Sequence, residues 1–421
     1  MEKSGGRLIN IGLRTATLCA KFLFIFFLAK YLSPASVGYY GLFTATVGYC
    51  LYFVGLDFYT YSTREVLKTP NDQRGRLLKG QAMLSGVLYL ILLPVAFVLL
   101  QFSGWPEPLV LWFFPILILE HFNQEISRLL IAVSEQITAS LILFIRQGSW
   151  AMVIVVLMAW DTSSRHLQTV LVCWSGAGLA ASILGMWRIK HLRMGGWQHP
   201  VDWRWIKKGI AISAGFLVAT LALRAVQTLD RYWLEGLVGI DLVGAYVLFL
   251  GVASTLMVFL DAGVFAYAYP ELIKLHQQRQ YQAAQQKIKV MLVYTLVFAA
   301  GFSLVSWLLL PYLLDWISNP IYSQALRMYP WLLLAMVINA VSMVPHFALY
   351  ASGNDRPIIF SHMAALGAFT LTVWIVAPHW QMLAVPAGLN VSFTVILVWK
   401  SIAYRYVSTI LPDQKGTLKT N

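Results

Sequence analysis

The sequence predicts an all-α polytopic membrane protein with twelve transmembrane helices in two pseudo-symmetric six-helix lobes. Hydrophobic residues make up 59% of the 421 residues and charged residues only 12%, against about 25% charged residues in soluble domains. Apolar stretches recur along the chain, and the two halves resemble each other. So much apolar surface needs a bilayer as its solvent. A soluble enzyme, a nucleic-acid-binding domain and a disordered chain are therefore excluded.

Each predicted span is an apolar stretch long enough to cross the hydrocarbon core, which takes about 20 helical residues. The breaks between spans carry turn residues such as Asn319-Pro320. Trp160 and Trp380 lie at predicted span ends, as expected for tryptophans at a membrane interface. The twelve predicted spans are residues 8–31, 37–61, 81–102, 108–133, 137–160, 166–187, 209–233, 241–268, 290–314, 327–352, 358–377 and 381–404.

The distribution of cations predicts that both termini are cytoplasmic. Of the 31 Lys and Arg residues, 22 lie in the segments on the N-terminal side of the membrane, including four from Lys400 onward, and four lie on the other side. The first helix is expected to be retained, because no small-residue cleavage site follows it. The predicted parts are an N-terminal lobe (1–190), a cytoplasmic linker (191–208), a C-terminal lobe (209–404) and a cytoplasmic tail (405–421).

The halves repeat one another without gaps. Nine identities fall within 32 aligned positions, more than apolar composition alone would produce. Each half has an even number of spans, so the repeats run in the same direction through the membrane, as in alternating-access transporters. Val37, Gly38, Tyr40, Leu42, Phe43, Phe53, Tyr61, Glu65 and Lys68 recur as Val243, Gly244, Tyr246, Leu248, Phe249, Phe259, Tyr267, Glu271 and Lys274.

Short motifs carry a resemblance to a known family. They are Leu28-Ala-Lys-Tyr-Leu-Ser-Pro34 with Val37-Gly38-Tyr39-Tyr40-Gly41, Thr228-Leu-Asp230-Arg231-Tyr232 with Val243-Gly244-Ala245-Tyr246, Ala132-Val-Ser-Glu135, and Tyr350-Ala-Ser-Gly353-Asn354. With the span count and the two lobes, they resemble the polysaccharide transporter branch of the multidrug/oligosaccharidyl-lipid/polysaccharide (MOP) exporter superfamily, whose fold is MATE-like. Within that branch the chain is most similar to Wzx-type O-antigen flippases.

The resemblance implies a transporter of lipopolysaccharide biosynthesis and not an enzyme. Its substrate would be undecaprenyl-diphosphate-linked oligosaccharide, an O-antigen or similar repeat unit, moved to the periplasmic leaflet of the bacterial inner membrane. Expected partners are this lipid-linked glycan, the bilayer and other polysaccharide-assembly membrane proteins, with no nucleic acid.

Five cations lie within predicted spans, where charge is expensive: Arg14, Lys21, Arg128, Arg146 and Arg224. Arg14 and Lys21 share a helix face because they are seven residues apart, and Arg224 and Arg231 repeat that spacing. We predict a cationic substrate cavity lined by Arg14, Lys21, Arg146, Arg224 and Arg231. Arginine suits a diphosphate because its planar fork binds phosphate oxygens in a bidentate way.

The alternative is that these cations form structural ion pairs. Glu125 and Arg128 have the i,i+3 spacing of a local helical pair, and we interpret them in this way. Lys21 has Glu120 as a candidate partner, and Arg231 follows Asp230 directly and suits the outer interface.

Acidic residues within or near the spans are candidates for coupling transport to an ion gradient, since a buried carboxylate can exchange protons. Glu120, Glu125, Asp57 and Asp261 are the coupling-ion candidates, although the two aspartates also suit wet helix ends. The sequence has no ATPase motif, so a proton or sodium gradient is the expected energy source. Neither a cofactor nor a metal is expected, because the cysteines lie in apolar spans and the histidines are scattered.

Two other classes remain as alternatives. Asp72-Gln-Arg74-Gly75-Arg76 lies where the major facilitator superfamily has a Gly-rich, Arg-rich loop, although the opening glycine is missing. A sugar or drug transporter of that superfamily, or a MATE-like multidrug exporter, therefore stays open. An O-antigen polymerase or ligase is less favoured, because such an enzyme needs a large outside loop and the predicted outside loops are short.

Overall fold

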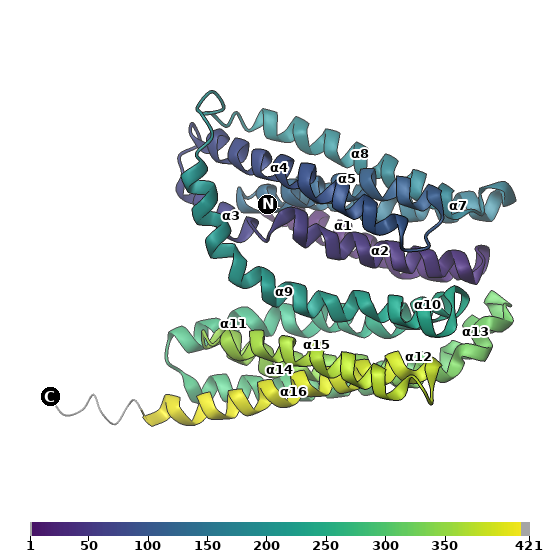
Figure 1. Ribbon diagram of the computed structural model, residues 1–421. Helices are drawn as coiled ribbons and strands as arrows, with labels where there is room; N and C mark the ends of the chain where they lie inside the picture. Colours follow the sequence, from purple (N-terminus) through teal and green to yellow (C-terminus); the bar gives the residue numbers. More distant parts are fainter. Residues whose placement is uncertain (1, 414–421) are drawn as a thin grey trace. The chain divides into compact units, whose positions relative to one another are not determined.

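The computed structural model describes the backbone of residues 2–413, and the side chains of 6–408 except 7, 216 and 219. This part of the chain consists of helices and short connections, without strands (Figure 1). It divides into two compact units, Met1–Leu221 (unit 1) and Ala222–Asn421 (unit 2). The unit boundary lies within α9 (Trp203–Val238).

Each unit is a bundle of apolar helices. The other helices of unit 1 are α1 (Glu2–Tyr31), α2 (Pro34–Gly55), α3 (Tyr59–Lys68), α4 (Arg74–Gln101), α5 (Glu107–Ala132), α6 (Gln136–Phe144), η1 (Ile145–Ser149), α7 (Trp150–Trp160), η2 (Thr162–Ser164) and α8 (Leu167–His191). Those of unit 2 are α10 (Ile240–Leu260), η3 (Asp261–Phe265), α11 (Ala266–Gln277), α12 (Tyr281–Ile317), α13 (Pro320–Gln324), η4 (Ala325–Met328), α14 (Tyr329–Ala351), α15 (Arg356–Val376) and α16 (Gln381–Asp413).

The predicted fold class is confirmed. Within residues 2–413, eleven spans, each a single helix or a run of consecutive helical segments, are long and apolar enough to cross a membrane. The segments Trp203–Gly215 and Thr220–Val238 of α9 together make a candidate twelfth span. The cytoplasmic location of the termini stays a prediction.

The second predicted span is too long. It was expected to reach residue 61, but α2 ends at Gly55. Leu56 and Asp57 have left-handed backbone conformations, with φ of 48° and 50°, which no α-helix can continue through. The chain therefore turns at Asp57 and begins the separate helix α3.

The repeated residues mark equivalent core positions in the two units. Leu42 and Phe43 in α2 are completely buried, and so are Leu248 and Phe249, their counterparts in α10. Each pair fills the interior of its own bundle, where a change of even one methylene disturbs the packing. The repeat therefore reflects the shared packing of the two units and does not by itself mark a substrate site.

The Asp72–Arg76 motif has a structural role in unit 1, where it holds the connection between α8 and α9. The amide of Gly75 donates to the carbonyl of Gly195 at 2.7 Å, and the amide of Gly195 donates to the carbonyl of Asn71 at 2.9 Å. A Cβ on Gly195 would lie 2.5 Å from the carbonyl oxygen of Asp72, closer than real Cβ atoms approach. This backbone contact explains why glycine occupies both positions.

The start of α9 packs on unit 1. Trp205 meets Phe58 edge to face with ring centroids 5.2 Å apart, and both rings pack with Ile206. A Cβ on Gly209 would lie 2.4 Å from the Phe58 ring. The residues from Trp203 are therefore already helical and anchored, although the sequence predicted a linker as far as residue 208.

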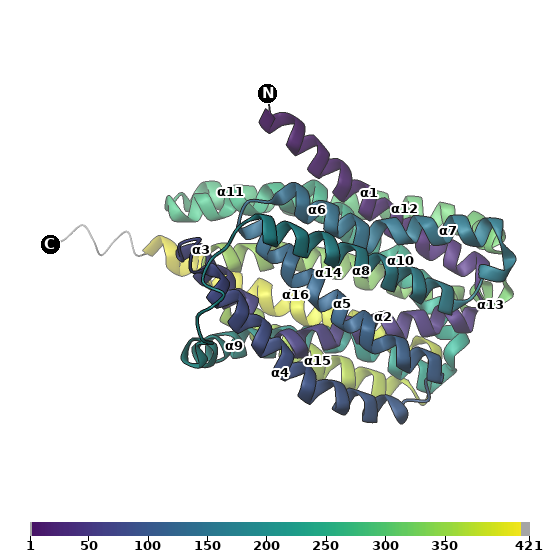
Figure 2. The same ribbon diagram turned by 90° about the horizontal axis from the view of Figure 1, so that it is seen from above.

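In unit 2, α16 packs along both α14 and α15, and the three helices run alongside one another in both views (Figures 1 and 2). The last span was predicted to end at residue 404, but α16 continues to Asp413. Lys400, counted above among the cytoplasmic cations, has a side chain that is only 1% exposed. The sequence could not show this, since Lys400 lies close to the end of an apolar stretch.

Candidate functional site

Two of the predicted site cations form a row on α1. The Arg14 Nε donates to Ser140 Oγ at 3.2 Å, and the Lys21 Nζ donates to Gln147 Oε1 at 3.3 Å. Both pairs are 126 residues apart in the chain, so α1 lies in parallel register with α6 and η1. Both cations are exposed. Their hydrogen-bond partners, Ser140 and Gln147, are neutral, so neither of these hydrogen bonds neutralises its cation.

Arg146, also predicted to line the cavity, lies in a different setting. Its Nη1 lies 3.1 Å from Glu120 Oε2 and donates to the backbone carbonyl of Glu120 at 3.1 Å. Trp174 Nε1 donates to Glu120 Oε1 at 2.8 Å. Arg146 and Glu120 are each 6% exposed, so this is a buried, hydrogen-bonded ion pair between η1 and α5.

Lys21 lies next to this pair, and its charge interacts with those of Glu120 and Arg146. The Glu120 carboxylate pairs with Arg146 and accepts from Trp174, although the sequence had suggested it as a partner for Lys21. A paired carboxylate neutralises Arg146 and leaves the net positive charge of the group on Lys21. Among the predicted site cations of unit 1, Arg14 and Lys21 are therefore the two that are exposed.

A second polar cluster surrounds Glu125 on α5. Glu125 Oε1 lies 2.5 Å from Arg128 Nη1, the i,i+3 pair that the spacing indicates. Gln81 donates to the other carboxylate oxygen at 2.5 Å, and the Arg128 guanidinium lies over the Tyr59 ring at 3.5 Å. Asp57 is buried, and its charge interacts with that of Glu125. The structure thus brings together two of the four coupling candidates, Asp57 and Glu125.

The two predicted site cations of unit 2 both contact Gln227. Arg224 Nη1 donates to Gln227 Oε1 at 3.0 Å, and Arg231 Nη1 donates to its backbone carbonyl at 2.5 Å. Arg231 also pairs with Asp230 at 3.2 Å. Arg224 is exposed, whereas the Asp230 carboxylate is buried. Asp261, the remaining coupling candidate, is exposed and begins the π-helical turn η3.

The completely buried Tyr246 completes the Asp230 group by donating its hydroxyl to Asp230 Oδ2 at 2.6 Å. We expect Tyr246→Phe to lower the free energy of unfolding by about 1–3 kcal/mol, because a buried carboxylate oxygen loses its donor. Tyr322→Phe is the matched control, since the Tyr322 hydroxyl is also buried but has no hydrogen-bond partner. Denaturation of the purified variants measures both changes; equal losses would show that the Asp230 bond contributes nothing.

One charged cluster was not predicted from the sequence. Lys400 Nζ lies 3.2 Å from His346 Nδ1 and 3.1 Å from His362 Nε2, within unit 2. These residues are far apart in the sequence and follow no known ligand spacing, so only the packing of α14, α15 and α16 brings them together. Among the described residues, no group of three or more His, Cys, Asp or Glu side chains is placed to hold a metal ion.

Comparisons with known proteins agree with the fold. The family described as polysaccharide biosynthesis protein matches residues 6–276. An inward-facing multidrug resistance MATE family transporter of the MOP superfamily is similar in structure, with a TM-score of 0.79 at 12% identity, covering 96% of this chain and 99% of that chain. No curated protein sequence matches the chain.

Two further solved structures are similar. A MATE transporter from Vibrio cholerae has a TM-score of 0.62 at 13% identity, covering 96% of this chain and 97% of that one. A MOP superfamily transporter from Pyrococcus furiosus, described as having a binding pocket of reverse polarity, has a TM-score of 0.57 at 14% identity, covering 97% and 95%. With a family match over more than half of its length and a MATE-like fold throughout, the chain belongs to the polysaccharide biosynthesis protein family.

Proposed function

We propose that this protein is a flippase for undecaprenyl-diphosphate-linked oligosaccharide, an O-antigen or similar repeat unit of lipopolysaccharide. It takes the head group at the cytoplasmic leaflet of a bacterial inner membrane and releases it at the periplasmic leaflet by ion-coupled alternating access. The family supports a role in polysaccharide assembly, and the fold is that of membrane transporters rather than of an enzyme.

The observation that carries the proposal is the cationic row on α1. Arg14 and Lys21 lie two helical turns apart in an apolar span, and neutral hydrogen-bond acceptors hold them. Charged side chains in a span are costly and face a bundle interior or a water-filled path. A diphosphate offers the negative charge and the acceptor oxygens that this row lacks. Ser140 and Gln147 orient the two cations without neutralising them.

A multidrug exporter is the second candidate, because the similar solved structures include multidrug transporters. A cationic drug would be repelled by the Arg14–Lys21 row, whereas an anionic head group is attracted to it. Glu120 and Glu125 do not reverse this sign, since each is paired with an arginine. The charge of the row therefore favours a lipid diphosphate.

Deleting the gene tests the proposed function. We expect surface polysaccharide to disappear and lipid-linked repeat units to accumulate facing the cytoplasm, with both effects reversed by the wild-type gene. Loss of a polymerase would still leave single repeat units outside, and loss of a drug exporter would change drug sensitivity with polysaccharide intact. Unchanged surface polysaccharide in the null strain would contradict the proposal.

A further inference from the structure

Unit 2 contains a buried group of three nitrogen side chains, each from a different helix. Lys400 on α16 is 1% exposed and His362 on α15 is 8% exposed, while His346 on α14 is partly buried. The Lys400 ammonium donates to His346 Nδ1 at 3.2 Å and to His362 Nε2 at 3.1 Å. The two imidazole rings are stacked, with centroids 6.5 Å apart and planes inclined by 11°.

The described side chains provide no counter-ion for the charge of this Lys–His–His cluster. None of the ion pairs formed by the described side chains includes any of its three residues. Arg146, the other deeply buried cation discussed above, pairs with Glu120 at 3.1 Å. A lone buried charge is expensive, and proteins relieve that cost by giving up the proton. The cluster is therefore built differently from a structural ion pair.

Geometry also restricts what the cluster can hold. Both imidazole nitrogens accept from Lys400, so both rings are neutral while the ammonium is charged. A second proton on either ring would place like charges about 3 Å apart. Sodium is a hard cation that prefers oxygen ligands, and this cluster offers only nitrogen donors and a positive charge. With Lys400 1% exposed, no water-sized space surrounds its ammonium. One proton is the ligand that fits.

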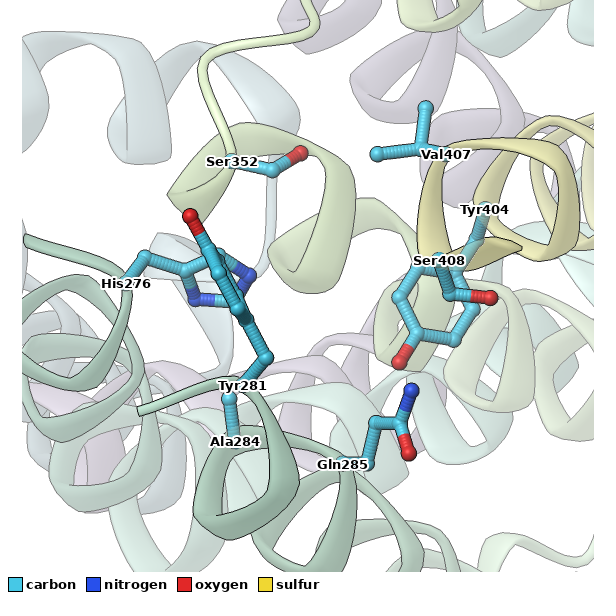
Figure 3. A pocket seen from close by; sticks show the side chains of 8 residues that line it. All are labelled: His276, Tyr281, Ala284, Gln285, Ser352, Tyr404, Val407 and Ser408. Carbon is cyan, nitrogen blue, oxygen red and sulfur yellow. The ribbon is translucent and has the colours of Figure 1, made fainter. Parts of the chain in front are cut away.

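A small pocket lies beyond the cluster along α16. It is lined by Tyr404, one helical turn beyond Lys400, and by His276, Gln285, Ser352 and Ser408 among others (Figure 3). Its volume is about 10 Å³, roughly the minimum that holds one water molecule.

The titratable groups around the cluster come from its neighbouring helices. On α14 the His346 ring stacks on Tyr350, with centroids 6.5 Å apart, and Tyr350 is 49% exposed. On α15 the facing group is His362, and on α16 itself it is Tyr404, while His276 of α11 lies across the pocket. All of these groups are neutral or cationic, so a proton on Lys400 has no fixed negative charge to retain it.

We propose that the Lys400–His346–His362 cluster is the site where the transporter binds and releases its coupling proton; this inference rests on the proposed function. The Lys400 ammonium gives its proton to a water molecule that reaches it when the transporter changes state, leaving a neutral amine and a hydronium ion, and the amine takes up a proton again in the other state of the cycle. Loss of the charge weakens the two charge-assisted hydrogen bonds that join α14 and α15 through α16. The coupling ion is then a proton and not sodium.

Proton binding is tested on the purified full-length protein without substrate. With ¹⁵N-labelled histidine, we expect the His346 and His362 resonances, assigned with H346N and H362N, to shift in one shared step between about pH 5 and about pH 9. The step should be insensitive to sodium and absent in Lys400→Met. Lys207→Met, which changes an exposed lysine of α9, should leave it unchanged. Resonances that ignore pH, or an identical step in Lys400→Met, overturn the proposal.

Coupling is tested separately in the null strain. Lys400→Met and His362→Asn are expected to abolish surface polysaccharide at normal membrane levels of the protein, whereas Lys207→Met restores it. His362→Asn keeps the lysine and removes only one acceptor, so it remains informative should Lys400→Met not fold. Full restoration by both cluster variants overturns the proposal and leaves the flippase function intact. If the wild-type gene does not restore surface polysaccharide, the proposed function is contradicted, and the proposed coupling role is contradicted as well.

Discussion

Replacing Arg146 by methionine is expected to lower the free energy of unfolding by about 3–5 kcal/mol, because Glu120 is then left buried without its counter-ion. The Glu120–Arg146 pair is 3.1 Å apart, and both side chains are under 10% exposed. Denaturation of the purified variant measures the change.

Two further variants make this result specific. Arg76→Met breaks the Arg76–Asp202 pair, which has the same 3.1 Å separation but lies on the surface, so its cost should stay below about 1 kcal/mol. Combining Arg146→Met with Glu120→Gln should recover much of the stability, because no buried charge remains. If Arg146→Met is instead as stable as Arg76→Met but blocks translocation, Arg146 belongs to the substrate site.

Removing the cationic row on α1 is expected to impair transport strongly. A hydrogen bond to a charged group contributes about 1.5–3 kcal/mol, which corresponds to roughly a 10- to 100-fold loss of translocation for Arg14→Ala or Lys21→Ala. The double variant should lose more, while Arg14→Lys and Lys21→Arg retain most activity because the charge remains. Surface polysaccharide per amount of membrane-inserted protein measures the effect.

The neutral partners supply the control. Gln147→Ala removes the acceptor that holds Lys21 at 3.3 Å but keeps the charge, so transport should fall much less than in Lys21→Ala. Since no described acidic side chain forms an ion pair with Arg14 or Lys21, these alanine variants should also keep normal stability. Wild-type translocation by the double alanine variant would show that the head group is not bound there.

The sequence alone determined the membrane class, the number of apolar helices and the two-unit repeat. These properties follow from length and composition within single segments, because each span must be apolar over about 20 residues whatever its neighbours are. The equivalence of Phe43 and Phe249 could also be found in the sequence, since gapless repeats conserve core positions at a fixed offset. The Glu125–Arg128 contact could also be predicted from the sequence, because the two residues lie within one helical turn of each other.

Only the tertiary structure decided which partner each buried charge meets. Arg146 and Lys21 both lie near Glu120. The packing of the helices pairs Glu120 with Arg146, whereas Lys21 donates to Gln147. Lys400 appeared to be an interfacial lysine until α14 and α15 placed a histidine on each side of it. These contacts join residues 26 to 126 positions apart. They depend on the rotation and register of whole helices, which no local pattern in the sequence encodes.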